Sequence, residues 1–307
     1  DNHSGWHHLR TSIHCSMNVA LSGSPCNGPD VPGFGSHADK ELAIAWYKAG
    51  CLFPFMRNHA NAGTARQEPW VFGPEALQTI RHHVRLRYKL LPYMYQLWND
   101  QEQNGTAVMR PLFHDFANTD SMELDRVDDQ FLIGPAILQA PIVQQGQQQR
   151  TVALPGRCRW MDVNTGEFLA GDRSVHVTSN AESTPIYLRE GSLVPMQVGV
   201  RTTAANDFAE LHVILGAGST DTATRAYVAA DGPSYGYQRG VRSIYRLTAS
   251  RSGDVLTLDV SALQTGWKPL RLRVVGYGGA NTLQLRVGAT HSTLALTPCA
   301  WCFSGGT

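Results

Sequence analysis

The sequence has almost no net charge and few charged side chains for its 307 residues. Its 26 basic and 25 acidic residues leave a formal charge of +1, and charged residues make up only 17% of the chain. Nucleic acid and acidic membrane surfaces attract proteins with a basic excess, so neither is expected as a partner. Apolar residues make up 42%, which is enough for a packed core and argues against disorder.

Long apolar runs and dense cysteines are also lacking. No run of about 18 apolar residues occurs, so no membrane-spanning helix is expected. Six cysteines in a chain of this length are too few for the framework of a small disulfide-stapled protein, although Cys15 and Cys26 are close enough in sequence to pair. Cys299-Ala-Trp-Cys302 is a single CxxC motif, and no second pair stands near it to complete a zinc site.

The length predicts about two domains, or two small domains and part of a larger one, at roughly 150 residues per domain. The first residue is Asp1 rather than Met, which indicates a fragment or a processed subunit. Two N-x-S/T sequons begin at Asn2 and Asn104 and are compatible with a secretory route.

Two helices are predicted within the first fifty residues. Apolar residues recur at three- and four-residue steps over 6–21, with Ser4 as the expected N-cap. The second helix is expected to begin near Ser36, where Ser36 and Asp39 resemble a capping box, and to stop at Gly50.

A third helix is predicted to start at Pro74 and to end at Asn104-Gly105. Pro92 falls inside it and is expected to kink or split it, because its ring excludes the carbonyl four residues back. The segment 52–57 is apolar enough to be a buried strand. Helices that alternate with short strands are typical of part of an α/β barrel.

From about Val108 the pattern changes to short apolar or alternating runs separated by turn residues. Spacings of about ten residues favour β-sandwiches over βαβ units. The expected strand runs are 131–143, 151–154, 160–163, 186–188 and 193–196, then 211–215, 226–229, 255–260, 270–275, 283–287 and 293–296.

Candidate polar groups for chemistry gather between residues 1 and 70. Arg57 and His59 directly follow the apolar run 52–56, and functional groups of a barrel stand where its strands end. Each group also has a structural interpretation: an Arg57–Glu68 ion pair, a structural role for His59, and a turn role for Asp30 in its Gly/Pro-rich segment.

The order of several motifs resembles family-31 glycoside hydrolases, and most closely the α-glucosidase II branch. The likeness is strong over about residues 1 to 200. Its motifs are D-N-x-S-x-W at 1–6, G-x-D-x-x-G-F at 28–34, P-F-M-R-N-H at 54–59, R-x-E-P-W at 66–70, R-Y-x-L-L-P-Y at 87–93, V-M-R-P-L at 108–112, D-D-Q-F-L-I-G at 128–134 and R-E-G-S-L-V-P at 189–195.

This resemblance implies a (β/α)8 barrel followed by two β-sandwich domains. The chain would then carry the C-terminal third of the barrel at 1–107, a proximal β-sandwich at 108–198 and a distal β-sandwich at 199–307. Pro29 and Pro32 depart from the family pattern, and proline removes a hydrogen-bond donor from a strand, so we expect a short strand or a reshaped site there.

The resemblance further implies a retaining exo-α-glucosidase that acts on terminal non-reducing α-linked glucose without metal or organic cofactor. Asp1 matches the family's general acid/base, whereas the family's nucleophile motif has no counterpart here, so the nucleophile is expected on an upstream segment of the same barrel. A free α-ammonium on Asp1 would favour its ionised carboxylate and oppose its role as an acid. We therefore do not expect Asp1 to be a free terminus in an active enzyme.

The same resemblance implies a set of substrate-binding residues. They are His59, Arg57, Asp30, Phe34, Trp6 and His3, with Arg57 and Asp30 as a polar pair. Aromatic faces and directional donors together suit a sugar, which has apolar ring faces and hydroxyl groups.

Two other functions stay open at this point. An α-transglucosylase would use a sugar hydroxyl in place of water, and a non-catalytic carbohydrate-binding or assembly subunit would explain the missing nucleophile. An α-glucoside or glycan is the expected substrate, and the endoplasmic reticulum lumen or the cell exterior is the expected location.

Overall fold

The computed structural model describes residues 2–180, 182–197, 202–203, 210–215, 223–232, 234–267, 271–275, 282–287 and 290–295. These residues form two compact units. The first contains the described residues within Asp1–Arg87 and Asp100–Tyr187, and the second those within Tyr88–Asn99 and Leu188–Cys302. None of the helices found among the described residues is both long and apolar enough to cross a bilayer. Asp1 and the Cys299–Cys302 pair lie outside the described residues.

Helix α1 (Trp6–Leu21) confirms the first predicted helix, since Leu9, Ile13 and Met17 are buried along one face. The predicted N-cap is wrong. Gly5 occupies that position, and the Ser4 hydroxyl is buried without a hydrogen-bond partner. The Ser4 backbone N–H instead donates to the Gly35 carbonyl at 2.7 Å, so this segment is extended beside another loop rather than curled over the helix end.

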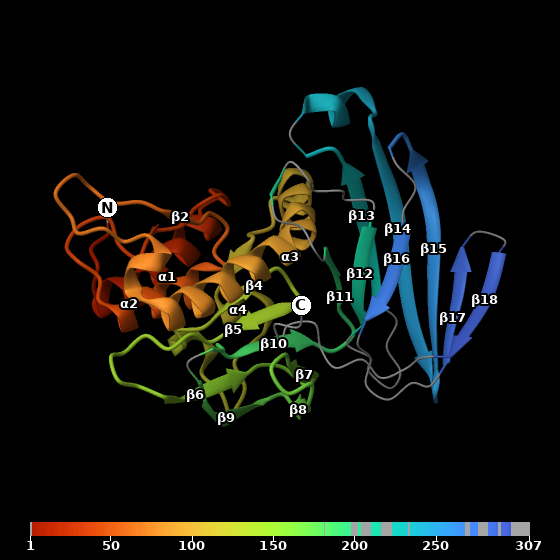
Figure 1. Ribbon diagram of the computed structural model, residues 1–307. Coiled ribbons are helices and arrows are strands. Elements are labelled where there is room, and N and C mark those ends of the chain that lie inside the picture. Colours follow the sequence, from red (N-terminus) through yellow and green to blue (C-terminus); the bar gives the residue numbers. More distant parts are fainter. Residues whose placement is uncertain are drawn as a thin grey trace. The chain divides into compact units, whose positions relative to one another are not determined.

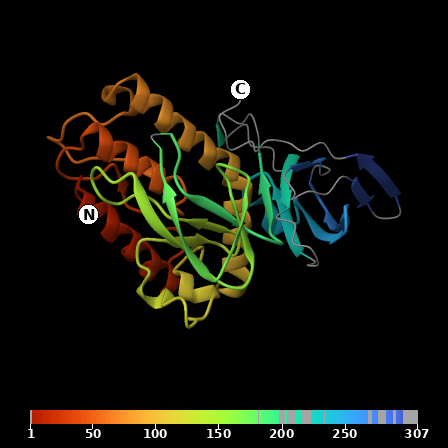
Figure 2. The ribbon, with the colours of Figure 1, turned by 90° about the horizontal axis from the view of Figure 1, so that it is seen from below.

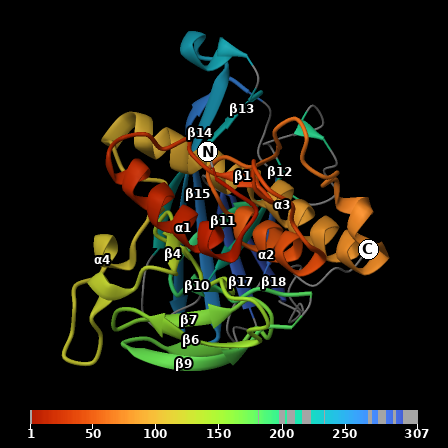
Figure 3. The same cartoon turned by 90° about the vertical axis from the view of Figure 1, so that its left-hand side faces the viewer.

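Helix α2 (Lys40–Gly50) ends where the sequence predicts. Its cap is Asp39, whose Oδ1 accepts a hydrogen bond from the Leu42 N–H at 2.8 Å. Ser36 is not the cap, because it lies four residues before the helix in a left-handed conformation with φ of 66°. Figure 3 shows α1 and α2 next to each other in the first unit.

Helix α3 (Pro74–Asn104) runs without a break through Pro92, so the expected split is wrong. The helix is visible in Figure 2 in orange to gold. Leu90, Tyr93 and Met94 around the proline are fully buried. Packing of these side chains stabilises the helix by more than one lost backbone hydrogen bond costs. Gly105 ends it in the left-handed conformation, as predicted.

A short parallel sheet joins β1 (Asp30–Val31) to β2 (Arg57–Asn58), with Asp30 opposite Arg57. The strand expected over 52–57 is wrong, since residues 52–55 form turns and bends and only Arg57 of this segment pairs in a strand. The Arg87 guanidinium donates to the carbonyls of Phe53 and Pro54 at 2.5 and 2.9 Å. The carbonyls of Phe53 and Pro54 therefore bond to a side chain. Only Arg57 and Asn58, further along the chain, pair as strand β2. The short β1 agrees with the effect expected from the neighbouring prolines.

The rest of the first unit is β-structure with short helical segments, α4 (Leu112–Asp115) and η2 (Leu124–Arg126). Strands β3 (Met109–Arg110), β4 (Phe131–Ile133), β5 (Ile137–Gln139), β10 (Ile186–Arg189), β7 (Arg159–Asp162) and β8 (Phe168–Ala170) form a six-stranded sheet in that order. Strands β6 (Gln149–Leu154) and β9 (Arg173–Thr178) form a second sheet. Trp160, Tyr187 and Leu132 are fully buried in the core of this region, whose strands are shown in Figure 1.

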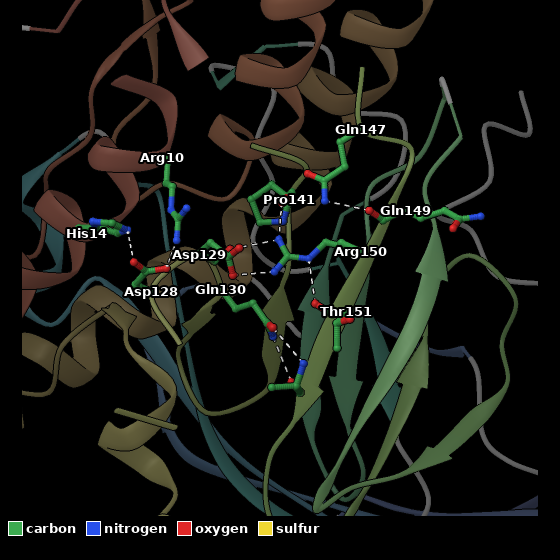
Figure 4. Close-up of polar contacts among 11 residues, drawn as sticks. Arg10, His14, Asp128, Asp129, Gln130, Pro141, Gln147, Gln149, Arg150 and Thr151 are labelled. Carbon is green, nitrogen blue, oxygen red and sulfur yellow. Dashed lines mark hydrogen bonds and ion pairs between the residues drawn. The ribbon is translucent and has the colours of Figure 1, made fainter. Parts of the chain in front are cut away.

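Three consecutive residues join this β-region to its surroundings. Asp128 accepts from Arg10 of α1 at 2.8 Å and lies 3.3 Å from His14 Nε2 (Figure 4). Asp129 pairs with the buried Arg150 of β6 at 2.6 Å. Gln130 exchanges two hydrogen bonds with the backbone of Ala153. The D-D-Q segment thus contacts α1 and anchors β6.

The second unit contains two sheets. Strands β11 (Leu193–Met196), β12 (Glu210–Leu215) and β16 (Arg271–Val275) form one of them. The other has the order β13 (Ala223–Ala230), β14 (Arg242–Ser252), β15 (Val255–Thr265), β17 (Thr282–Val287) and β18 (Thr290–Ala295). The sequence did not predict β14, because its buried positions include the polar Ser243 and the small Ala249. From α3, Gln96 exchanges hydrogen bonds with the backbone of Val228 at 2.7 and 3.0 Å.

A buried histidine gives the first unit a pH-dependent stability. His83 of α3 is 1% exposed, and burial lowers its pKa from 6.5 to about 3. Between these values the unfolded chain binds a proton that the folded chain does not, so stability falls as pH falls from about 6.5 towards 3. The contribution is at most about 1.4 kcal/mol per pH unit.

We expect the free energy of unfolding of His83→Phe to fall less steeply as the pH is lowered than that of the unaltered protein. Urea unfolding at intervals between pH 7 and pH 4 measures the free energy of unfolding. The control is His176→Phe, which removes an exposed imidazole from the surface. An unaltered slope in His83→Phe would contradict the assignment.

Candidate active site

The floor of the candidate site is the adjacent ends of β1 and β2. Asp30 is 6% exposed, and its Oδ1 accepts from Arg57 Nε at 2.5 Å. The Arg57 side chain is 52% exposed and stands 5.7 Å over the Phe55 ring. The buried carboxylate therefore fixes the guanidinium, which still presents part of its surface to solvent. Asp30 is a strand residue in an ion pair rather than the turn residue considered from the sequence.

The Arg57–Glu68 ion pair considered from the sequence is not formed. Arg57 pairs with Asp30, and Glu68 instead lies 3.3 Å from Arg66. The reason is the parallel register, which sets Arg57 opposite Asp30 across the two strands. Hydrogen bonds from backbone N–H groups and from Arg66 lower the pKa of Glu68.

Asn2 holds the first described residues against this floor. Its side-chain amide donates to the Asp30 carbonyl at 2.8 Å and accepts from the Asp30 N–H at 3.1 Å, as a neighbouring strand would. Its own carbonyl accepts from Phe34 N at 3.0 Å and Gly35 N at 3.1 Å. Asn2 is therefore fixed beside Asp30. Sequence reasoning treated Asn2 only as part of a motif and missed this role.

Phe34 and His59 form an aromatic wall. Their ring centroids are 5.3 Å apart and their planes are inclined by 33°. The Phe34 carbonyl accepts from Asn61 N at 2.9 Å, which ties the two loops together. Phe34 is half-buried, whereas His59 is exposed, so the imidazole is free to meet a ligand.

The Gln67 side chain holds the backbone of His59. It is 6% exposed, and its Nε2 donates to the His59 carbonyl at 2.9 Å. Asn58, next to His59, donates through Nδ2 to the Tyr47 hydroxyl and to the Gln67 carbonyl, both at 2.8 Å. Gln67 is the x of the R-x-E-P-W motif, so the motif did not single it out.

His3 and Trp6 lie on the segment that leads into α1. His3 is exposed, and its Nδ1 is 3.3 Å from the Ser36 hydroxyl. A Cβ at Gly35 would lie 2.5 Å from the same Nδ1, so only glycine permits this close approach. Trp6 is half-buried at the first position of α1. Partial burial and the neighbouring His3 and His7 lower the pKa of His8.

The structure thus brings together two pairs, Asp30 with Arg57 and Phe34 with His59, on neighbouring strands and the loops that follow them. Two rings and partly exposed N–H donors suit a ligand that has both apolar faces and hydroxyl groups. Across the residues that the structure describes, no group of three or more His, Cys, Asp or Glu side chains is arranged to hold a metal ion.

Comparisons with known proteins give a consistent result. Residues 1–97 match the model of the glycosyl hydrolases family 31 TIM-barrel domain, and residues 105–194 match that of the family 31 C-terminal domain. A probable glucan 1,3-alpha-glucosidase of Oryza sativa is 34% identical over 87% of this chain and 29% of its own length. Alpha-glucosidase 2 of Bacillus thermoamyloliquefaciens is 33% identical over 87% of this chain and 34% of its own.

Solved structures agree on the fold. The alpha-xylosidase of Xanthomonas citri is 26% identical with a TM-score of 0.79, over 100% of this chain and 33% of its own. A glucosidase II alpha subunit is 22% identical with a TM-score of 0.81, over 98% of this chain and 35% of its own, which shows the fold alone. The chain spans about a third of the length of these relatives. The predicted fold class, part of a barrel followed by β-sandwich structure, is confirmed.

Proposed function

Because this chain belongs to glycoside hydrolase family 31, we propose that it supplies one wall of the glucose-binding site of a retaining exo-α-glucosidase. The observation that carries the proposal is the pairing of Asp30 with Arg57 beside the Phe34–His59 wall. The α-glucosidases among the relatives support an α-linked glucoside as the substrate class.

The proposed mechanism uses two carboxyl groups, which in retaining enzymes lie about 5 to 5.5 Å apart. One carboxylate attacks the anomeric carbon while the Asp1 carboxyl gives its proton to the leaving glycosidic oxygen. Asp1 then takes a proton from water as that water attacks the covalent glycosyl intermediate. The support for this role is the place of Asp1 in the sequence, directly before Asn2, whose side chain bonds to the backbone of Asp30. We assign the nucleophile to a segment of the barrel upstream of residue 1.

The other residues would bind the sugar ring. His59 and Arg57 are the proposed hydrogen-bond donors to hydroxyl groups, and Asp30 orients Arg57. Phe34 is the proposed apolar surface for the glucose, and Trp6 and His3 the proposed boundary on the leaving-group side. Donors in this position stabilise the transition state more than the ground state, since their hydrogen bonds strengthen as the oxocarbenium ion forms.

Besides the missing nucleophile, the two prolines Pro29 and Pro32 were a reason to consider a non-catalytic relative. That reason is weak, because the two-residue β1 still sets Asp30 opposite Arg57 in parallel register. We also propose domain boundaries at residues 107 and 198. The proposed location of the protein is the secretory pathway. The exposed sequon residue Asn104, which is available for a glycan, supports the location.

The stereochemistry of the product tests the proposal. We expect the polypeptide that joins this chain to its upstream barrel segment to release α-glucose first from 4-nitrophenyl α-glucoside. Proton NMR at early times separates the two anomers before they equilibrate. Release of β-glucose first, or no hydrolysis by the folded polypeptide, would refute the proposal.

A further inference from the structure

An exposed tyrosine stands on a turn of the second unit, between β13 and β14. The turn is the short helix η4 (Tyr235–Arg239), at one end of the five-stranded sheet (Figure 1). Tyr235 is 70% exposed, which is the largest exposure among the large hydrophobic side chains of the described residues. Its ring centroid lies 6.4 Å from that of Tyr237, and the two planes are inclined by 40°.

The turn that carries the two tyrosines is held by hydrogen bonds at both ends. The Ser234 hydroxyl accepts from the Gly236 N–H at 2.9 Å, and the Gly236 carbonyl accepts from Val241 N at 3.0 Å. Gly240 closes the turn in the left-handed conformation with φ of 82°, and its carbonyl accepts from Gln264 of β15 at 3.3 Å. The Tyr235 ring is therefore presented by a fixed backbone, which lowers the entropic cost of binding.

Hydrogen-bonding side chains surround the two rings. The Gln238 side-chain amide donates to the Tyr237 hydroxyl at 3.4 Å, and both Gln238 and Arg239 are exposed. A flat apolar face next to amide and phenol groups, with an exposed guanidinium on the same turn, is the complement of a sugar, as at the candidate active site.

We propose that Tyr235 and Tyr237 form a second carbohydrate-binding site, separate from the catalytic one, that takes a chain of α-linked glucose units. Successive rings of an α-linked chain turn relative to one another. Two aromatic rings inclined by 40° suit such a curved chain better than a flat β-linked one. The choice of glucose as the unit rests on the proposed function, whereas the choice of a sugar rests on the residues of the turn. The site would hold a polymeric substrate or product on the protein.

Affinity electrophoresis of the polypeptide that includes the upstream segment tests this site. Native gels contain soluble starch, dextran or, for comparison, barley β-glucan. We expect starch or dextran to retard the unaltered protein. We expect Tyr235→Ala to weaken the binding about tenfold, and Tyr235→Phe, which keeps the ring, to bind like the unaltered protein. Val287→Ala, which alters another half-exposed apolar side chain of the same sheet, is the matched control and should not change retardation.

Equal retardation of Tyr235→Ala and the unaltered protein would overturn the proposal, as would retardation by β-glucan alone or by none of the polymers. Hydrolysis of 4-nitrophenyl α-glucoside is measured in parallel and should be the same in Tyr235→Ala. A protein that hydrolyses no glucoside yet is retarded through Tyr235 would refute the proposed function and leave this second site standing.

Discussion

Asp1→Asn is expected to lower kcat/KM for maltose by about 10² to 10⁴, the usual contribution of a general acid–base group. The amide keeps the size of the side chain but cannot give a proton to the leaving oxygen. The deficit should be much smaller for α-glucosyl fluoride, because fluoride leaves without protonation. The second step still needs a base to activate water, so the covalent intermediate should accumulate with this substrate. Stopped-flow kinetics of both substrates measure the two steps.

Azide provides a check on the assigned role of Asp1. Azide attacks the glycosyl intermediate without a general base, so it should raise the turnover of Asp1→Asn and release α-glucosyl azide. Asp120→Asn, at an exposed carboxylate of the β-region, serves as the control and should keep normal turnover. An equal loss on maltose and on the fluoride, with no effect of azide, would show that Asp1 is not the acid/base.

His59→Ala is expected to give the second-largest loss, about 10²-fold in kcat/KM, which corresponds to about 3 kcal/mol of transition-state stabilisation. The imidazole is exposed beside the Phe34 ring, and its backbone is held by Gln67 rather than by the imidazole itself. Removal of the ring should therefore leave the loop in place. Most of the loss should fall on kcat, because hydrogen bonds to the ring hydroxyls strengthen in the transition state.

Steady-state kinetics with 4-nitrophenyl α-glucoside measure this effect. His59→Gln keeps a hydrogen-bond donor and should recover part of kcat, which a purely structural role for the imidazole would not predict. His176→Ala removes an exposed imidazole from β9 and should leave the kinetics unchanged. Normal turnover of His59→Ala with an unchanged melting temperature would remove His59 from the site.

The candidate site was only partly accessible to sequence reasoning. Arg57 and His59 could be chosen as residue types placed after an apolar segment, because strand ends face the substrate side of a barrel. The residue types left the partner of Arg57 open, whereas the family resemblance implied its pairing with Asp30. Glu68 and Asp30 were both acidic residues within reach along the chain, and the parallel register selected Asp30.

The supporting residues were not accessible in this way. Gln67 and Asn2 act through backbone carbonyls and N–H groups of distant residues, and such contacts leave no pattern of hydropathy or charge in the sequence. The Tyr235 turn was also missed, because two tyrosines two residues apart look like ordinary strand or core residues.

The sequence by itself determined the helices, the change to β-structure after residue 107 and the family, because local hydrophobic spacing, caps and ordered motifs are properties of neighbouring residues. Only the tertiary structure decided that α3 continues through Pro92, that residues 52–56 are not a strand and that the Asn2 side chain bonds to the backbone of Asp30. Each of these depends on a side chain or strand far away in sequence. Packing and hydrogen bonds between distant residues outweigh local propensity, and no local pattern encodes them.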